Sequence, residues 1–304
     1  MRYSPEQFDR KSTSFYKVAD LRKAFEDGDI LEASVVKCDK DLNLEVQLTP
    51  NIFGTIPADE FEFSAEGKPV KSIAVLSKVG KTVKFKITTM DKIDGDYKIT
   101  LSRKAAQQEC FEEYISKLEP GQIIDARVTY VEYYGAFCDI GCGFTALLPI
   151  ESICVSRIVN PSKELRGMRN IKAIVKSVEN NRVTLSHKEL LGTWEEEIAK
   201  FNVGDTVPGV ARVIEDYGVF VELTPNLVGL ADTYPDIESG DNVSVYIKAI
   251  IPEKMKIKLL IISKNDKANK PIHYDYKIPQ SGVITDWKYS PECSVKKFET
   301  HIGK

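Results

Sequence analysis

The feature that most constrains this chain is a pentapeptide that occurs twice. Residues 133–137 (YYGAF) return 83 positions later as residues 216–220 (DYGVF), and flanking glycine and leucine residues keep the same offset. A match in register over about 30 residues indicates duplicated modules. Each copy combines an aromatic residue, a glycine and a phenylalanine, so ligands with flat rings, nucleic acid bases first among them, are the expected binding partners.

A third, weaker copy precedes the other two. Residues 28–33 match residues 121–126 in position and polarity, and the segment 99–103 (ITLSR) matches residues 183–187 (VTLSH). Within each copy, short alternating segments are separated by Gly, Asn and Pro, which is typical of a five-stranded barrel. The sequence therefore predicts a mainly β protein with three tandem five-stranded barrels.

Helical spacing replaces this alternation between the modules. We expect short amphipathic helices there that pack one barrel against the next. The expected order is an N-terminal helical segment (1–27), a divergent barrel (28–104), a linker helix (105–120), a barrel (121–189), a linker helix (190–203), a barrel (204–264) and a C-terminal extension (265–304). The extension is expected to pack on the third barrel because it is rich in aromatic residues, namely Tyr274, Tyr276, Trp287, Tyr289 and Phe298.

Composition excludes several classes of protein. With 304 residues, of which 42% are hydrophobic and 29% charged, the chain resembles ordinary soluble proteins rather than disordered or fibrous ones. The longest aliphatic run, residues 259–262, is too short to cross a bilayer, and the first residues form no apolar leader, so a cytoplasmic location without membrane contact is expected. The six cysteines form no CxxC pair, which argues against a disulfide scaffold and against zinc.

The charge and the motifs restrict the function further. The formal net charge is −3, although residues 121–189 carry nine Lys and Arg against seven Asp and Glu, and residues 204–264 carry six against nine. Nucleic acid binding is compatible with this balance, but not in a strongly electrostatic mode. No histidine lies in a nucleophile–base pattern, and no nucleotide-binding or zinc-protease motif occurs. We expect a protein without catalytic activity and without a cofactor.

Strand alternation predicts which side chains face solvent. In the segment 136–140, Phe137 and Asp139 share one face. Because a carboxylate prefers water, Phe137 is expected to be exposed beside Asp139, and Phe220 beside Glu222 in the next copy. An exposed phenylalanine in both copies indicates a binding role rather than core packing.

The tyrosines of the repeat require a departure from alternation. Tyr134 and Tyr217 lie three positions before their phenylalanines, which would place them on the opposite face. Gly135 and Gly218 permit a β-bulge, so each tyrosine is expected to share a surface with its phenylalanine. The alternative interpretation is that the tyrosines cap the barrels and a linker helix covers the phenylalanines.

Basic residues are expected beside these rings. Arg127 in the second module and Arg212 in the third are predicted to point outward, and the closing strands bring Arg182 and Lys256 to the same area. Aromatic faces flanked by one or two cations bind single-stranded bases with little sequence preference, at about 1–3 kcal/mol per base.

These features resemble the S1 domain, an OB-fold barrel. The resemblance covers most of residues 28–264 and rests on the core [FY]-G-[AV]-F, on residues 156–162 (SRIVNPS) and on residues 182–188 (RVTLSHK). It implies binding of single-stranded RNA or mRNA in translation, as in the ribosomal protein for which the domain is named. The RNA-binding positions that the resemblance implies are Tyr134, Phe137, Arg182, Tyr217, Phe220 and Lys256.

The chain also departs from the pattern of this family. The family's histidine position is Pro149 in the second module and Asp232 in the third, and the first module has Leu42 and Glu45 in place of the aromatic residues. We therefore expect the second module to bind RNA best and the first to bind protein, for example the 30S ribosomal subunit. Two further interpretations stay open: an RNA-decay or RNA-stability factor that acts off the ribosome, and an interaction scaffold that has lost RNA binding, which the negative net charge favours.

Overall fold

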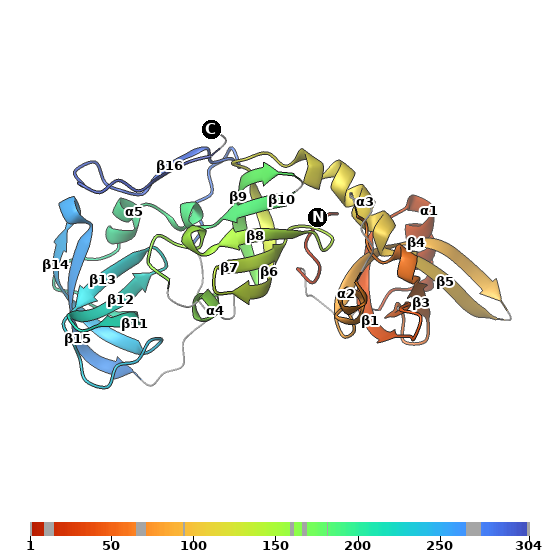
Figure 1. Ribbon diagram of the computed structural model, residues 1–304, viewed down its shortest axis with the longest axis horizontal. Helices are drawn as coiled ribbons and strands as arrows, with labels where there is room; N and C mark the ends of the chain where they lie inside the picture. Colours follow the sequence, from red (N-terminus) through yellow and green to blue (C-terminus); the bar gives the residue numbers. More distant parts are fainter. Residues whose placement is uncertain are drawn as a thin grey trace. The chain divides into compact units, whose positions relative to one another are not determined.

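Alternating side chains close each repeated module into a barrel. The computed structural model describes residues 2–8, 15–64, 71–93, 95–158, 161–165, 169–180, 182–265 and 275–302, and Figure 1 shows its ribbon. In every barrel the third and fifth strands pair in parallel. The predicted mainly β fold, with three tandem five-stranded barrels joined by short helices, is confirmed.

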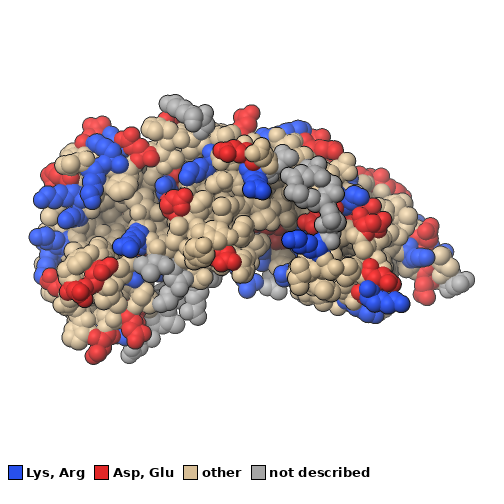
Figure 2. Space-filling view, viewed as in Figure 1, with Lys and Arg blue, Asp and Glu red and all other residues tan. Residues whose placement is uncertain are grey.

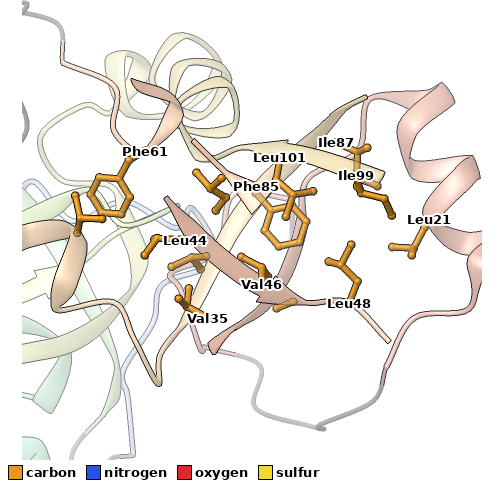
Figure 3. Close-up of a cluster of buried hydrophobic side chains, with 14 residues drawn as sticks. Leu21, Val35, Leu44, Val46, Leu48, Phe61, Phe85, Ile87, Ile99 and Leu101 are labelled. Atoms are coloured by element: carbon orange, nitrogen blue, oxygen red, sulfur yellow. The ribbon is translucent and has the colours of Figure 1, made fainter. Parts of the chain in front are cut away.

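The first barrel follows helix α1 (Val18–Asp27). Its strands are β1 (Leu31–Cys38), β2 (Leu44–Gln47), β3 (Phe53–Ile56), β4 (Thr82–Ile93) and β5 (Asp96–Ser102), in the order β1-β2-β3-β5-β4. The 3₁₀ turn η1 (Ala58–Glu60) and helix α2 (Ser72–Leu76) lie between β3 and β4. Figure 3 shows that inward side chains such as Val46, Phe85 and Leu101 fill the barrel, and that Leu21 of α1 joins this core.

The second barrel follows helix α3 (Arg103–Glu113) and the 3₁₀ turn η2 (Ile115–Lys117). Helix α3 begins at once after β5 because the Ser102 hydroxyl accepts the N–H of Ala105 and so caps the helix. The strands are β6 (Ile123–Glu132), β7 (Gly135–Asp139), β8 (Thr145–Pro149), β9 (Asn170–Glu179) and β10 (Arg182–Ser186), in the order β10-β8-β7-β6-β9. Between β8 and β9 lie the 3₁₀ turn η3 (Ile150–Ser152) and helix α4 (Pro161–Glu164).

The third barrel follows the 3₁₀ turn η4 (Lys188–Leu191) and helix α5 (Trp194–Ile198). Its strands are β11 (Thr206–Glu215), β12 (Gly218–Thr224), β13 (Leu227–Ala231), β14 (Asn242–Ile251) and β15 (Lys256–Asn265), in the order β11-β12-β13-β15-β14, with the turn η5 (Pro252–Lys254) before β15. In the extension, β16 (Asp286–Lys288) pairs with β17 (Glu299–His301). Tyr274 lies outside the described residues.

The chain divides into two compact units. The first contains Met1–Leu118 and Asp139–Thr145, and the second contains Glu119–Cys138 and Ala146–Lys304. The third barrel, the extension and most of the second barrel therefore belong to the same unit. The segment Asp139–Thr145, at the end of β7 and the start of β8, packs with the residues of the first unit.

Asn226 connects the second and third barrels. It is buried in the turn between β12 and β13. Its side-chain oxygen accepts the N–H of Val155 at 3.0 Å, and its side-chain nitrogen donates to the carbonyl oxygens of Lys188 at 2.9 Å and Gly192 at 3.2 Å. One side chain of the third barrel thus bonds a loop of the second barrel and the connection between the two.

The extension packs on both of these barrels. Tyr289 is buried in the core of the third barrel, where its hydroxyl donates to the main-chain oxygen of Asn226. Tyr276 contacts the second barrel, and its hydroxyl lies 3.2 Å from Nε2 of His187. Ile302 is buried in a small cluster that includes residues of the second barrel. The extension therefore ties the two barrels together a second time.

Candidate nucleic-acid interface

The second and third barrels each carry an aromatic pair where their first two strands meet. The ring centroids of Tyr134 and Phe137 are 6.2 Å apart with planes at 87°, and those of Tyr217 and Phe220 are 6.2 Å apart with planes at 89°. Both tyrosines are exposed and both phenylalanines are half-buried. The same geometry in two barrels indicates that the local sequence determines it.

Gly135 and Gly218 make this arrangement possible. Their φ angles are 152° and 151°, a conformation that residues with a side chain rarely adopt. A Cβ on Gly135 would lie 2.3 Å from the carbonyl oxygen of Leu148, and one on Gly218 would lie 2.4 Å from that of Ala231. Only glycine allows the chain to turn this closely past the third strand, and the turn brings tyrosine and phenylalanine onto one surface.

The irregularity in strand pairing lies on the neighbouring strand rather than at the glycine. In the third barrel the register between β11 and β12 shifts between Ala211 and Val213, so Arg212 is the additional residue of a β-bulge. Gly218 is the first residue of β12 and pairs with Glu215, directly after the turn formed by Asp216 and Tyr217.

Asp139 and Glu222 are buried, and the expectation that they face water was wrong. Asp139 is 3% exposed and accepts the N–H groups of Gly141 at 2.8 Å and of Glu6 at 2.7 Å. Burial, together with the nearby Glu6 carboxylate, raises the pKa of Asp139 to about 7. Backbone N–H groups replace water around Asp139. The presence of Asp139 on the same strand face as Phe137 is therefore no evidence that Phe137 is exposed.

Arg212 and Arg127 are held by groups of the protein itself. Arg212 forms a bidentate ion pair with Glu222, with Nε–Oε2 and Nη2–Oε1 distances of 2.9 and 3.0 Å. Arg127 is 8% exposed, and its Nη1 donates to Oδ1 of Asn170 at 3.1 Å. The contribution of these two guanidinium groups to RNA binding stays a prediction, and in the described structure they stabilise the barrels.

Arg182 and Lys256 are exposed at the starts of β10 and β15. The strand register adds Lys258, because Phe220 lies opposite Leu230 and Leu230 lies beside Lys258. Sequence reasoning missed Lys258, although alternation along residues 256–260 places it on the same face as Lys256.

Asp232, at the family's histidine position in the third barrel, forms an ion pair with Lys248. Their charged atoms are 2.8 Å apart, and the hydrogen bond from Lys248 lowers the pKa of Asp232. Figure 2 shows acidic and basic side chains interspersed over much of the visible face. Stacking rather than net charge is therefore the stronger interaction that these barrels can offer.

The first barrel lacks the aromatic pair. In its β2–β3 register, Glu45 pairs with Thr55 as Phe220 pairs with Leu230 in the third barrel, and Val46 pairs with Gly54 as Val221 pairs with Gly229. By this correspondence Leu42 occupies the position of Tyr217. The bulge of β1 places Val36 where the third barrel has Arg212.

The arrangement of the described residues offers neither a metal site nor a membrane-spanning helix. Within these ranges no group of three His, Cys, Asp or Glu side chains is arranged to hold a metal ion. None of the helices in the described part of the chain has the length and apolar character needed to span a membrane.

Comparison with known proteins agrees with this geometry. The profile of the family described as "S1 RNA binding domain" matches residues 24–104 and 117–188, which cover half of the chain and contain the first and second barrels. The small ribosomal subunit protein bS1 of Leuconostoc lactis is 27% identical over 279 residues, which are 84% of this chain and 62% of that protein. The bS1 homolog of Bacillus subtilis (strain 168) is 28% identical over 260 residues, 82% of this chain and 63% of that protein.

A shorter match is also informative. The bS1 protein of Rhizobium meliloti (strain 1021) is 30% identical over 194 residues, which are 58% of this chain and 34% of that protein. The chain thus spans less than two thirds of the length of these relatives. Because the family profile matches half of its residues, and because the barrels have the strand order described above, the chain belongs to the S1 RNA-binding domain family.

Proposed function

We propose that this chain is a non-enzymatic, cytoplasmic RNA-binding protein that holds single-stranded RNA on its second and third barrels. The observation that supports this most is the duplicated pair of an exposed tyrosine and a half-buried phenylalanine, with the same centroid distance of 6.2 Å in both barrels. Two copies of one ring geometry on the outside of two barrels fit a ligand that is itself a repeat of flat rings.

The chemistry of the two sites supports RNA as that ligand. Each stacked base contributes about 1–3 kcal/mol and needs no particular sequence, because every base has a flat face. The carboxylates closest in sequence to the phenylalanines, Asp139 and Glu222, are buried and bonded within the protein. Arg182, Lys256 and Lys258 are exposed and could each contact a phosphate.

The similarity to ribosomal bS1 proteins supports a role in translation. We infer that the second and third barrels hold mRNA and that the first barrel contacts the 30S ribosomal subunit, because Leu42 and Glu45 stand where the other barrels have aromatic rings. A role in RNA decay or stability off the ribosome is the alternative with the same ligand. The other alternative is an interaction scaffold that does not bind RNA.

A fluorescence-anisotropy titration of the full chain with a labelled single-stranded oligouridine tests the proposal. We expect binding that weakens modestly with salt, since each phosphate contact changes the logarithmic salt slope by only about 0.7. The double variant Tyr134→Ala/Phe137→Ala is expected to bind at least about fivefold more weakly. Glu45→Ala in the first barrel is the matched control and should bind like the unaltered chain. Absence of binding at low salt would leave the scaffold interpretation.

The same double variant separates the two RNA-binding alternatives. In sedimentation with 30S particles, a protein that docks through its first barrel remains bound when Tyr134 and Phe137 are replaced by Ala. A protein that reaches the particle only through RNA is lost from it. If neither the unaltered chain nor the variant sediments with the particles, a role off the ribosome is favoured.

A further inference from the structure

The second barrel carries two additional tyrosines that the third barrel lacks. Tyr133 is 82% exposed and Tyr130 is 60% exposed. At the offset of 83 residues, the third barrel has Asp216 and Val213 at these positions. The two barrels therefore share their aromatic pair but differ in what surrounds it.

Tyr133 extends the aromatic pair into a row of three rings. Its centroid is 5.1 Å from that of Tyr134, with the planes at 90°, and Tyr134 in turn meets Phe137 edge to face. An edge-to-face contact uses only part of a ring's surface. Since Tyr133 is almost fully exposed, most of its surface is available to a base.

Tyr130 lies on the same outer surface. In the third barrel, Val213 of β11 is the cross-strand partner of Phe220, and directly opposed residues of antiparallel strands share a face. Tyr130 is the residue of β6 at the position of Val213. The Thr129 hydroxyl donates to the carbonyl oxygen of Phe137 at 3.0 Å, which holds β6 against β7 at this point.

The surroundings favour RNA over a protein as the ligand of these tyrosines. The ring of Tyr133 contacts that of Tyr134 in the proposed RNA site, and the second module has the more positive charge balance, nine Lys and Arg against seven Asp and Glu. In the third barrel, Asp216 instead places a carboxylate directly before Tyr217, where it would repel a phosphate.

On the basis of the proposed function, we propose that Tyr130 and Tyr133 are additional base-stacking residues. They make the second barrel the primary RNA-binding barrel, with contacts to more bases than the third barrel makes. The third barrel then holds the strand through Tyr217 and Phe220 alone. The unequal affinity of the two barrels arises from these two positions rather than from the shared aromatic pair.

Reciprocal substitutions in the full chain test this inference, with labelled oligouridine as the probe. Tyr133→Leu keeps an apolar contact with Tyr134 but removes the ring, and it should weaken binding at least about fivefold. Tyr130→Val should weaken binding in the same direction. Tyr133→Phe is the matched control and should bind like the unaltered chain. Both tyrosines are exposed, so these variants should keep the thermal stability of the unaltered protein.

The gain-of-function variants complete the test. In a chain that carries Tyr130→Val, Tyr133→Leu and Phe137→Ala, so that the third barrel dominates, Asp216→Tyr with Val213→Tyr should tighten binding at least about fivefold. If Tyr133→Leu and Tyr130→Val bind as well as the unaltered chain and the third barrel gains nothing, the inference is overturned. The proposed function would survive that result if Phe137→Ala still weakened binding. If the unaltered chain bound no RNA at all, the proposed function itself would be overturned.

Discussion

The first and second barrels have the same strand order but different outer surfaces. Leu101 and Leu185 occupy equivalent inward positions and both are fully buried. At the outward positions, Glu45 stands in the first barrel where Phe137 stands in the second. The family profile matches both barrels, although only the second carries the rings. Burial therefore keeps the inward residues that define the family, while the outward residues that would bind RNA are free to change.

The corner before the second strand is the sharpest difference in backbone. The second barrel has Gly135 with φ 152°, whereas in the first barrel the equivalent position is Asn43 and the left-handed residue is Leu42, with φ 64°. Gly135→Ala should destabilise the second barrel by roughly 3 kcal/mol or more, because the backbone strain adds to the close approach of the Leu148 oxygen.

Denaturant unfolding followed by tryptophan emission measures this effect. Both tryptophans of the chain, Trp194 and Trp287, lie in the second compact unit. Gly204→Ala is the control, because its φ is 99° but no atom lies within 4 Å of an added Cβ. It should cost only the strain, about 1 kcal/mol. Equal losses for the two variants would show that the carbonyl contact is unimportant.

The residue after the closing strand also distinguishes the two barrels. Arg103 follows β5 and pairs with Glu6 at 3.0 Å, whereas His187 follows β10 and is 1% exposed. Burial lowers the pKa of His187 to about 4. Its Nδ1 bonds the carbonyl oxygen of Ile153 at 3.0 Å, and its Nε2 bonds the hydroxyl of Tyr276, an arrangement that suits the neutral ring.

This pKa predicts how stability depends on pH. Between pH about 6.5 and pH about 4 the unfolded chain binds the His187 proton and the folded chain does not. The contribution of His187 to the free energy of unfolding is therefore complete above pH about 6.5. It is lost as the pH falls through this window, by at most about 3 kcal/mol. Unfolding of the tryptophan-containing unit at several pH values measures the loss. The His187→Gln variant should be less stable at pH 7, but its free energy of unfolding should change less with pH across the window. An identical pH dependence in the variant would assign the effect to other groups.

Transferring the rings into the first barrel tests whether the outward positions suffice. In a chain weakened by Phe137→Ala and Phe220→Ala, the graft Leu42→Tyr/Glu45→Phe should tighten oligouridine binding at least about fivefold. Glu45→Gln in the same background is the control for loss of the carboxylate alone. A graft that binds no better than the control would mean that the glycine corner is needed as well.

The fold was predictable because it depends on local alternation. Three copies of one pattern, each with a closing strand such as residues 183–186, predict three barrels. This prediction does not depend on which side chains lie on the outer surfaces. The aromatic pair was predictable for the same reason, since Tyr134, Gly135 and Phe137 are close in the sequence and recur together.

The rest of the site depends on residues that are distant in the sequence. Asp139 accepts the N–H of Gly141, which is close in the sequence, but also that of Glu6, 133 positions earlier, and no local pattern indicates this second contact. Arg212 meets Glu222 through the register between two strands. Tyr133 lies in a turn, where strand alternation predicts nothing, so its exposure was not anticipated even though the residue opens the repeated pentapeptide.

The buried amide of Asn226 has a consequence for how this chain could evolve or be divided. A duplicated module is usually a part that recombination can move or delete by itself. Here, removal of the second barrel would strip the Asn226 side chain of its partner at Val155, and removal of the third would leave Val155, Lys188 and Gly192 without the side chain that bonds them. The smallest segment that could be moved or deleted as a unit is therefore not one barrel but the second and third barrels together. It includes the extension, because the Tyr289 hydroxyl donates to the main-chain oxygen of Asn226.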